Sequence, residues 1–227
     1  MIRRGGAPAL VLLAWLACAL PTAAHDAEPL PALDFEPPAP GTYTLHRIMA
    51  APDGQVLGLD GRPQRLARLT RERITLLGFI YTTCVDPDGC PLAYRVFDTV
   101  RDAVAAVPAL RDRVRLVTLS FDPARDTPAA MRRYAGGSRL RGGDVPWLFL
   151  TTPSARELMP LVEGFGQDVR YEVDRSSGAV RRELAHVLKV FLVDRAGFVR
   201  EIYSSTFLHP QTVLNDIETL LLEERAR

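Results

Sequence analysis

The apolar and polar positions from residue 43 onwards predict strands and helices in alternation. Residues 73–81 form an apolar run of strand length, as expected of a strand that is buried on both faces. Residues 91–107 repeat their apolar residues at helical spacing, which predicts a helix with one stripe facing the core. The same patterns predict further strands at residues 113–121, 146–152, 186–194 and 198–204, and further helices at residues 127–135, 154–166 and 209–224.

Turn and capping residues support these boundaries. Thr127 and Ser154 are suited to capping the helices that follow them, and Pro91 is suited to the first position of its helix. Short strands joined by turns are expected at residues 42–49 and 54–66. Together these elements predict an α/β fold, with a mixed central sheet flanked by helices and an N-terminal β-hairpin extension.

The beginning of the chain predicts export. A basic start is followed by a short apolar run and by small residues that permit cleavage after Ala24, so residues 1–24 are expected to be a signal peptide. The alternatives are a retained membrane anchor and lipidation of Cys18. Residues 25–42 are rich in proline and are expected to be an extended tether to a folded domain at residues 43–227. We therefore expect a periplasmic protein, or one on the outer face of the cytoplasmic membrane.

Composition and charge narrow the class of function. Hydrophobic residues make up 47% of the chain, so a core can form without the help of disulfide bonds. The formal net charge is +1, and the arginines are scattered among acidic residues, as is typical of a solvated surface. These features argue against nucleic acid as a partner.

The candidate chemistry lies in the segment YTTCVDPDGCPLAY, residues 81–94, because export leaves Cys84 and Cys90 as the cysteines of the mature chain. Between them, Asp86-Pro87-Asp88-Gly89 has the composition of a β-turn, which would bring the cysteines together. This geometry permits a structural disulfide, a redox-active dithiol or a pair of metal-binding thiolates. Both aspartates are expected to be solvated, with a role as outer-shell acceptors as the alternative.

The position of Cys90 favours a reactive thiol. It stands at the amino end of the predicted helix, where free N–H groups and the helix dipole stabilise a thiolate. We therefore expect the pKa of the Cys90 thiol to be lowered.

Two thiolates do not saturate most metals, so a third ligand is sought among the four histidines. His25 would be the new N-terminus, His46 lies in the first predicted strand, and His209 caps the last helix, where a surface position is expected. His186 opens the predicted strand at residues 186–194. A lone histidine beside an apolar run is usually structural, so the pattern alone leaves a ligand role for His186 open.

Several segments resemble the Sco family, whose members handle copper and have a thioredoxin-like fold. The stretch LLGFIYTTC…CPLA resembles the family's strand, cysteine loop and helix start, and LSFDPARDTPAAMRRYA resembles its S-x-D-P-x-R-D-T-P segment. PWLFLTTPSARE resembles its W-x-F-L-T strand, and HPQTVLNDIETLL its closing helix. HVLKVFLVDRAG resembles its histidine followed by an aspartate, here His186 and Asp194. The resemblance covers nearly all of residues 43–225.

The resemblance implies that Cys84, Cys90 and His186 bind one copper ion, and that the two cysteines can also form a redox disulfide. Thiolates suit Cu(I), and an added imidazole suits Cu(II) as well. The usual family loop is C-x-x-x-C, whereas this chain has a longer C-x5-C loop.

The function that the resemblance implies is that of a copper metallochaperone, not an enzyme, which delivers copper to the binuclear copper site of a respiratory oxidase. Its partner would be an oxidase subunit or another copper carrier, and the protein would be a monomer held near the membrane through that partner. The alternative is a thiol–disulfide oxidoreductase that reduces partner cysteines before metal loading. The chain has no C-x-x-C motif and no proline just before His186, which favours metal binding. A thiol peroxidase fits less well, and a copper sensor or partner-binding domain is a further alternative.

Overall fold

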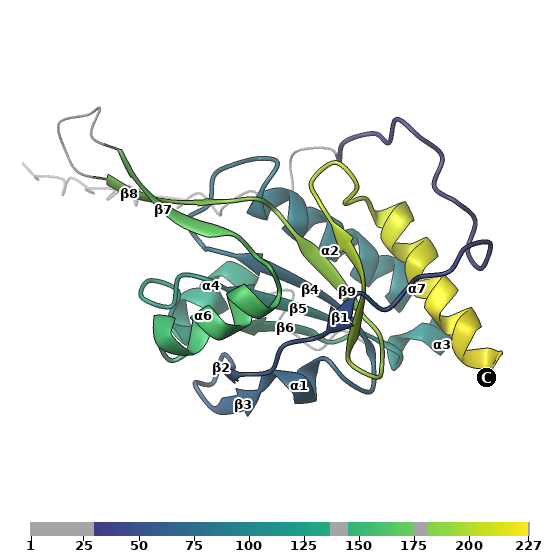
Figure 1. Ribbon diagram of the computed structural model, residues 1–227, viewed down its shortest axis with the longest axis horizontal. Helices are drawn as coiled ribbons and strands as arrows, with labels where there is room; N and C mark the ends of the chain where they lie inside the picture. The colour runs from purple at the N-terminus through teal and green to yellow at the C-terminus, as the bar shows by residue number, and fades with distance from the viewer. Residues whose placement is uncertain (1–29, 137–144, 175–180, 227) are drawn as a thin grey trace, which may run out of the picture.

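The computed structural model describes residues 30–136, 145–174 and 181–226, with the backbone alone for residues 171–174 and 181–186. The predicted signal peptide and the first part of the predicted tether lie outside these residues. Figure 1 shows a central sheet with helices on both of its faces, which confirms the predicted α/β architecture.

A six-stranded mixed sheet forms the centre of the domain. Its strands follow the order β1 (Met49–Ala50), β10 (Phe198–Tyr203), β9 (Val190–Val193), β4 (Ile74–Ile80), β5 (Val114–Ser120) and β6 (Trp147–Leu150). β4, β5 and β6 are parallel, whereas β9 is antiparallel to β4, β10 to β9 and β1 to β10. All seven residues of β4 are buried, as the apolar run of the predicted strand requires.

Helices cover both faces of the sheet. They are α1 (Leu66–Leu69), α2 (Cys90–Ala105), α3 (Pro108–Arg111), α4 (Pro128–Ala135), α6 (Ala155–Gly164) and α7 (Pro210–Arg225). α2, α4 and α7 share one hydrophobic cluster with Leu76 of β4, and α1 and α6 share a second with Leu77, because successive strand residues face opposite sides. Within the described part of the chain, no helix is long and apolar enough to cross a membrane.

The capping predictions are confirmed. Thr127 Oγ1 accepts a hydrogen bond from the N–H of Ala130 at 3.3 Å, and Ser154 Oγ accepts one from the N–H of Arg156 at 3.1 Å. These bonds satisfy N–H groups that have no partner within the first helical turn. α2 begins one residue earlier than predicted, with Gly89 in the capping position.

The predicted strand at residues 186–194 is wrong in its first half. His186 ends a different strand, β8 (Arg181–His186), which pairs antiparallel with β7 (Val169–Asp174) in a separate two-stranded sheet. β9 begins only at Val190. In Figure 1 the β7–β8 ribbon extends away from the body of the domain.

Side chains hold the junction between β8 and β9 in place. Gln167 Nε2 donates to the carbonyl oxygen of Val187 at 2.8 Å, and Lys189 Nζ donates to that of Gly166 at 2.6 Å. The apolar pattern continues across this junction, so periodicity alone cannot reveal that the chain changes its pairing partner there.

The N-terminal part supplies the predicted β-hairpin and an edge strand. β2 (Gln55–Leu57) and β3 (Pro63–Arg65) pair antiparallel as the hairpin. The strand predicted at residues 42–49 is wrong except for its last residue. The observed strand, β1, consists of Met49 and Ala50, which pair with β10 at the edge of the main sheet.

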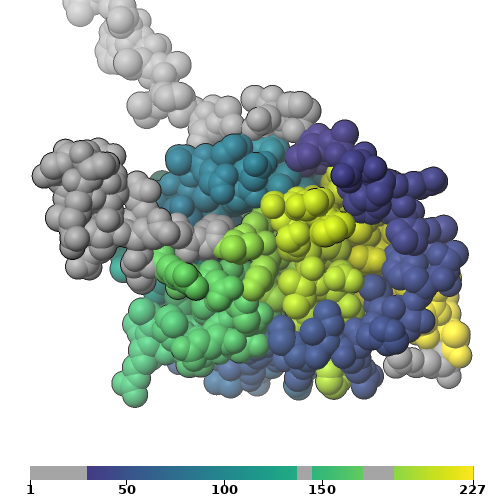
Figure 2. All heavy atoms as spheres, turned by 45° about the horizontal axis from the view of Figure 1, so that its top comes forward, coloured from purple at the N-terminus to yellow at the C-terminus, as the bar shows by residue number. Residues whose placement is uncertain are grey.

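The proline-rich segment, in its described part from residue 30, packs along α7. The amide of Asn215 donates to the carbonyl oxygen of Pro38 at 2.8 Å. The hydroxyl of Tyr43 donates to Asp216 Oδ1 at 2.5 Å. Figure 2 shows the purple atoms of this segment against the yellow atoms of the C-terminal elements, so these residues form part of the folded domain.

A buried ion pair joins the sheet, α7 and the N-terminal segment. Arg200 in β10 is 6% exposed, and its guanidinium lies 3.0 Å from Asp194 Oδ2 and 2.7 Å from Glu223 Oε2. Its Nε also donates to the carbonyl oxygen of Leu45 at 2.9 Å. The desolvation of this arginine is offset only while these acceptors stay in place.

Replacing Arg200 with methionine should therefore destabilise the fold strongly. The side-chain volume is largely kept, but the buried Asp194 loses its cation, and we expect the free energy of unfolding to fall by about 3–5 kcal/mol. Urea denaturation measures this loss. Arg62→Met is the matched control, because the Arg62–Asp60 pair is 84% and 55% exposed and should contribute at most about 1 kcal/mol. If the free energy of unfolding falls equally in the two variants, the buried ion pairs of Arg200 contribute no more to stability than the exposed pair.

Candidate functional site

Cys84 lies in the loop that joins β4 to α2, and Cys90 directly follows this loop, at the carboxyl end of a strand in the middle of the sheet. Open α/β sheets commonly place their functional groups at this end. The N–H of Cys84 donates to the carbonyl oxygen of Tyr81 at 3.1 Å, which closes a turn directly after β4. Cys90 is the first residue of α2.

The turn predicted at residues 86–89 is present. The N–H of Gly89 donates to the carbonyl oxygen of Asp86 at 3.0 Å, and the N–H of Asp88 donates to Asp86 Oδ1 at 3.1 Å. Residues 85–88 are exposed, whereas Cys84 and Cys90 are only 8% and 1% exposed. The long loop therefore projects its central residues into solvent and keeps both sulfurs inside.

The two thiols are hydrogen-bonded to each other, and no disulfide bond joins them. The predicted approach of the two sulfurs is thus observed. Sulfurs in direct contact can be joined by oxidation or can share one metal ion.

The expectation of a lowered pKa for Cys90 is wrong. Burial raises the pKa of the Cys90 thiol far above its ordinary value, and the hydrogen bond and charge of Cys84 raise it further. The backbone N–H groups of Tyr81 and Cys90 lower this pKa, but by less than burial raises it. The helix begins within one residue of the predicted position, but the burial of the Cys90 thiol raises its pKa by more than the helix end lowers it.

Aromatic side chains belong to the buried hydrophobic cluster that also contains both cysteines, or pack against it. The ring of Tyr94 lies 4.9 Å from that of Trp147 and 5.4 Å from that of Tyr134, between centroids, and Phe149 stacks on Trp147 at 4.9 Å. Burial raises the pKa of Tyr134, and the nearby Cys90 adds to this effect, which places the phenol close to the thiols. Sequence reasoning missed these residues because aromatic residues in strands and helices also have the pattern of an ordinary core.

Two further contacts that sequence reasoning missed hold the start of the cysteine loop. The side chain of Tyr81 is hydrogen-bonded to Cys84. Both the backbone N–H and the hydroxyl of Thr82 donate to the carboxylate of Asp126. Asp126 belongs to the S-x-D-P-x-R-D-T-P segment, which the sequence singles out without showing what it touches.

The backbone of His186 lies near the carboxyl end of β4, as the two cysteines do. β8 ends at His186, and Val190 then begins β9 opposite Gly78 of β4. Since β9 runs antiparallel to β4, the residues just before Val190 lie at the carboxyl end of β4, where the loop with Cys84 and Cys90 begins. The side chain of His186 is outside the described residues, so its role as a ligand remains a prediction.

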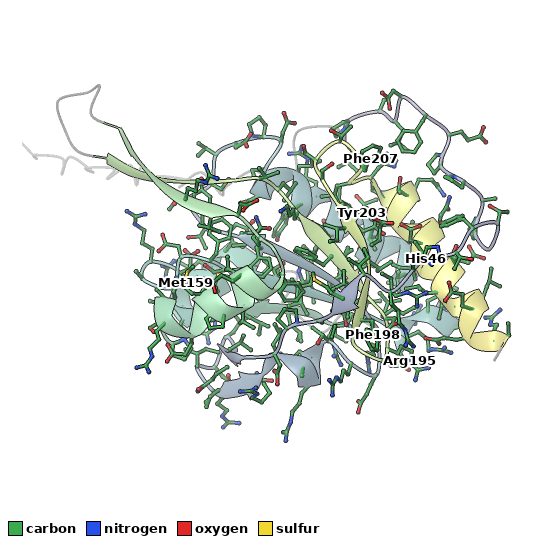
Figure 3. The ribbon with its side chains drawn as sticks, in the orientation of Figure 1. His46, Met159, Arg195, Phe198, Tyr203 and Phe207 are labelled. Carbon is green, nitrogen blue, oxygen red and sulfur yellow. The ribbon has the colours of Figure 1, made fainter. Side chains whose placement is uncertain are left out.

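The remaining histidines have other positions. His209 caps α7 as expected, with its Nδ1 accepting a hydrogen bond from the N–H of Gln211 at 3.1 Å. His46 is exposed just before the edge strand β1, and Figure 3 shows it on the α7 side of the molecule. His25 lies outside the described residues. Among the side chains that the structure describes, no group of three or more His, Cys, Asp or Glu could hold a metal ion.

Comparison with known sequences gives one family. The SCO1/SenC family model matches residues 61–222. A curated protein from Stutzerimonas stutzeri, whose name refers to copper binding, is 33% identical over 126 residues. That match covers 55% of each protein, so the chain spans about half the length of this relative.

Comparison with solved structures confirms the predicted thioredoxin-like fold of the Sco proteins. ScoI of Arabidopsis thaliana with copper bound has a TM-score of 0.63 at 16% identity, over 77% of this chain and 99% of that one. Apo Sco1 of Thermus thermophilus has a TM-score of 0.61 at 25% identity, over 79% and 95% of the two chains. A SCO1/SenC family lipoprotein from Bacillus anthracis has a TM-score of 0.61 at 20% identity, over 76% and 95%.

The buried Cys90 thiol, whose pKa is raised, should react slowly. We expect iodoacetamide at neutral pH to alkylate Cys90 at least about tenfold more slowly in the folded, reduced protein than in the same protein unfolded by urea, because the thiolate is the nucleophile. The rate in the folded protein should keep rising above pH 8.5 or so, the ordinary thiol pKa, since the thiolate forms only at higher pH. Peptide mass spectrometry measures each site. Equal rates in the folded and unfolded protein would contradict this account of the site.

Proposed function

The chain belongs to the SCO1/SenC family, and on that premise we propose that it is a copper metallochaperone. It binds one copper ion through Cys84, Cys90 and His186 and delivers the ion to the binuclear copper site of a respiratory oxidase. The proposal rests on the two thiols that are hydrogen-bonded to each other at the carboxyl end of β4. The segment that joins β8 to β9 lies at the same end of β4.

The donor set and the relatives both support copper as the cargo. Thiolates suit the soft Cu(I) ion, and an imidazole adds a ligand that also suits Cu(II). The structures of ScoI from Arabidopsis thaliana and from Bradyrhizobium japonicum are described with copper bound. The name of the Stutzerimonas stutzeri relative likewise refers to copper.

The surroundings of the thiols suit the uptake and release of a cation. Both thiols must lose their protons on binding a metal, and the burial of Cys90 makes the loss of its proton unfavourable until a positive charge arrives. Tyr94 and Trp147 belong to the same buried hydrophobic cluster as the two cysteines, and Tyr134 packs against that cluster. On the outer side the exposed loop leaves room for a partner, so copper can pass to it by exchange of one thiolate ligand after another.

The recipient of the copper and the place of the protein in the cell are proposed from the relatives and from the N-terminal sequence. One relative, BsSco, is described as a member of the Sco family of cytochrome c oxidase assembly proteins, which supports a respiratory oxidase or another copper carrier as the partner. The Bacillus anthracis relative is described as a lipoprotein, which supports a place at the outer face of the cytoplasmic membrane. The mass of the protein from its native cell decides whether residues 1–24 are removed.

A thiol–disulfide oxidoreductase is the second candidate, and the contact between the two sulfurs favours it. It would reduce the cysteines of a partner before metal loading, so that Cys84 and Cys90 end as a disulfide. Two features weigh against it. The raised pKa of Cys90 leaves little nucleophilic thiolate, and the segment before β9 lacks the proline that thioredoxin-like reductants carry there.

The reduced domain should bind one copper ion per chain, with thiolate-to-copper charge-transfer absorption for Cu(II). Cys84→Ser and Cys90→Ser should abolish tight Cu(I) binding, and His186→Ala should weaken Cu(II) binding strongly. Competition with a chelator measures these affinities. His46→Ala is the matched control, because this exposed histidine lies at the far edge strand and should not affect binding. Copper binding that survives the loss of both thiols would refute the proposal.

The same variants distinguish the two functions in cells. For a metallochaperone, oxidase activity at low copper should fall with His186→Ala as well as with each cysteine variant, and added copper should restore part of it. For an oxidoreductase, activity should survive His186→Ala and fail only with the cysteine variants, since the imidazole forms no bond in dithiol exchange. Normal oxidase activity of His186→Ala at low copper would therefore favour the oxidoreductase.

A further inference from the structure

The S-x-D-P-x-R-D-T-P segment, residues 120–128, forms a closed turn beside the cysteine loop. The carbonyl oxygen of Asp122 accepts hydrogen bonds from the N–H groups of Arg125 at 3.1 Å and Asp126 at 2.8 Å. The hydroxyl of Ser120 accepts one from the N–H of Asp122 at 3.0 Å. These local bonds direct the carboxylate of Asp126 towards the end of β4.

The carboxylate of Asp126 is almost completely buried, at 1% residue exposure, and accepts three hydrogen bonds. Ser120 Oγ donates to Oδ2 at 2.6 Å, the N–H of Thr82 donates to Oδ2 at 3.0 Å, and Thr82 Oγ1 donates to Oδ1 at 2.5 Å. A buried carboxylate requires such donors because its desolvation is otherwise uncompensated. Two of the three come from Thr82, 44 residues earlier in the chain.

Thr82 fixes the direction of the backbone just after β4. It lies within the turn that the N–H of Cys84 closes on the carbonyl oxygen of Tyr81. Since its backbone N–H and its hydroxyl are both held by one carboxylate, the first residues of the loop have a fixed direction. The following residues 85–88 are exposed, so the position of Cys84 depends on the residues that precede it.

We propose that Asp126 and Thr82 are positioning residues, which hold the Cys84 sulfur in contact with the Cys90 sulfur. Copper uptake by the paired thiols rests on the proposed function. The pairing itself does not, because it can be measured in the absence of any metal.

A carboxylate that merely stabilises the fold would be the competing explanation, and Asp216 provides the comparison. It is also buried, at 5% exposure, and accepts hydrogen bonds from the hydroxyls of Tyr43 at 2.5 Å and Tyr203 at 2.6 Å. Burial raises the pKa of both Asp126 and Asp216. Because Tyr43 and Tyr203 lie outside the cysteine loop, Asp216→Asn tests the loss of a buried, hydrogen-bonded carboxylate without a change in that loop.

The experiment is the dithiol–disulfide equilibrium of Cys84 and Cys90 in a glutathione buffer without metal. The two thiols lose two protons and two electrons as the disulfide forms, and oxidised glutathione takes them up to give two glutathione thiols. We expect Thr82→Val and Asp126→Asn to lower the equilibrium constant for disulfide formation about tenfold, or about 30 mV for this two-electron couple. The reason is that, without the hydrogen bonds between Thr82 and Asp126, the loop moves more freely and the two sulfurs are in contact less often.

Two variants serve as controls. Thr82→Ser keeps the hydroxyl and should stay within about twofold of the wild type in this equilibrium. Asp216→Asn should lower the melting temperature and leave the equilibrium constant unchanged. If Thr82→Val and Asp126→Asn also lower only the melting temperature, the positioning role is refuted. Thr82→Val alone decides the question if Asp126→Asn does not fold.

A Cu(I) titration of the same proteins separates this inference from the proposed function. If the wild type binds Cu(I), Thr82→Val should bind it about tenfold more weakly, and Thr82→Ser should bind it nearly as well as the wild type. If the wild type binds no copper, the metallochaperone proposal fails, and the positioning role is judged by the disulfide equilibrium.

Discussion

The burial of β4 is the constraint on which the rest of the structure depends. All seven of its residues are buried, with hydrophobic clusters on both faces and paired strands on both sides. Where such a strand ends, the N–H and C=O groups that are still shielded from water need partners within the protein. The carboxylate of Asp126 and the turn at Tyr81 supply these partners. The places of Cys84 and Cys90 follow from this arrangement, since Cys84 lies in the loop between β4 and α2 and Cys90 begins α2.

The same burial decides the chemistry of the thiols. It raises the pKa of Cys90, which makes the free thiol a poor nucleophile. A bound cation reverses this situation, because its charge stabilises thiolates that the protein interior would otherwise disfavour. Val85, next to Cys84, is 90% exposed, so the outer side of the loop stays accessible to a partner. These properties support the proposed binding of a metal ion over rapid thiol exchange.

Much of the fold could be predicted from the sequence because its signals are local. The apolar run of β4 reports burial on both faces, and the caps at Thr127 and Ser154 act over two or three residues. The turn at residues 86–89 is likewise a matter of neighbouring residues. The cysteine pair was therefore visible as a candidate site. For His186 the apolar pattern left a ligand role open, and the family resemblance alone suggested it.

The features that the sequence could not determine all depend on segments that are distant along the chain. The sequence placed Cys90 at a helix end, but its raised pKa results from burial, which only packing against residues such as Tyr134 and Trp147 produces. The chain changes its pairing partner just before Val190, within one apolar pattern, because Gly78 of β4 becomes its new neighbour. The contact of Asp126 with the cysteine loop spans 44 residues and exists because β4 and β5 lie side by side. The sequence by itself thus determined most of the helices and central strands and the cysteine pair. The tertiary structure decided the pairing of β8 with β7 and the environment of the thiols, because strand pairing and exposure to water are properties of the whole fold.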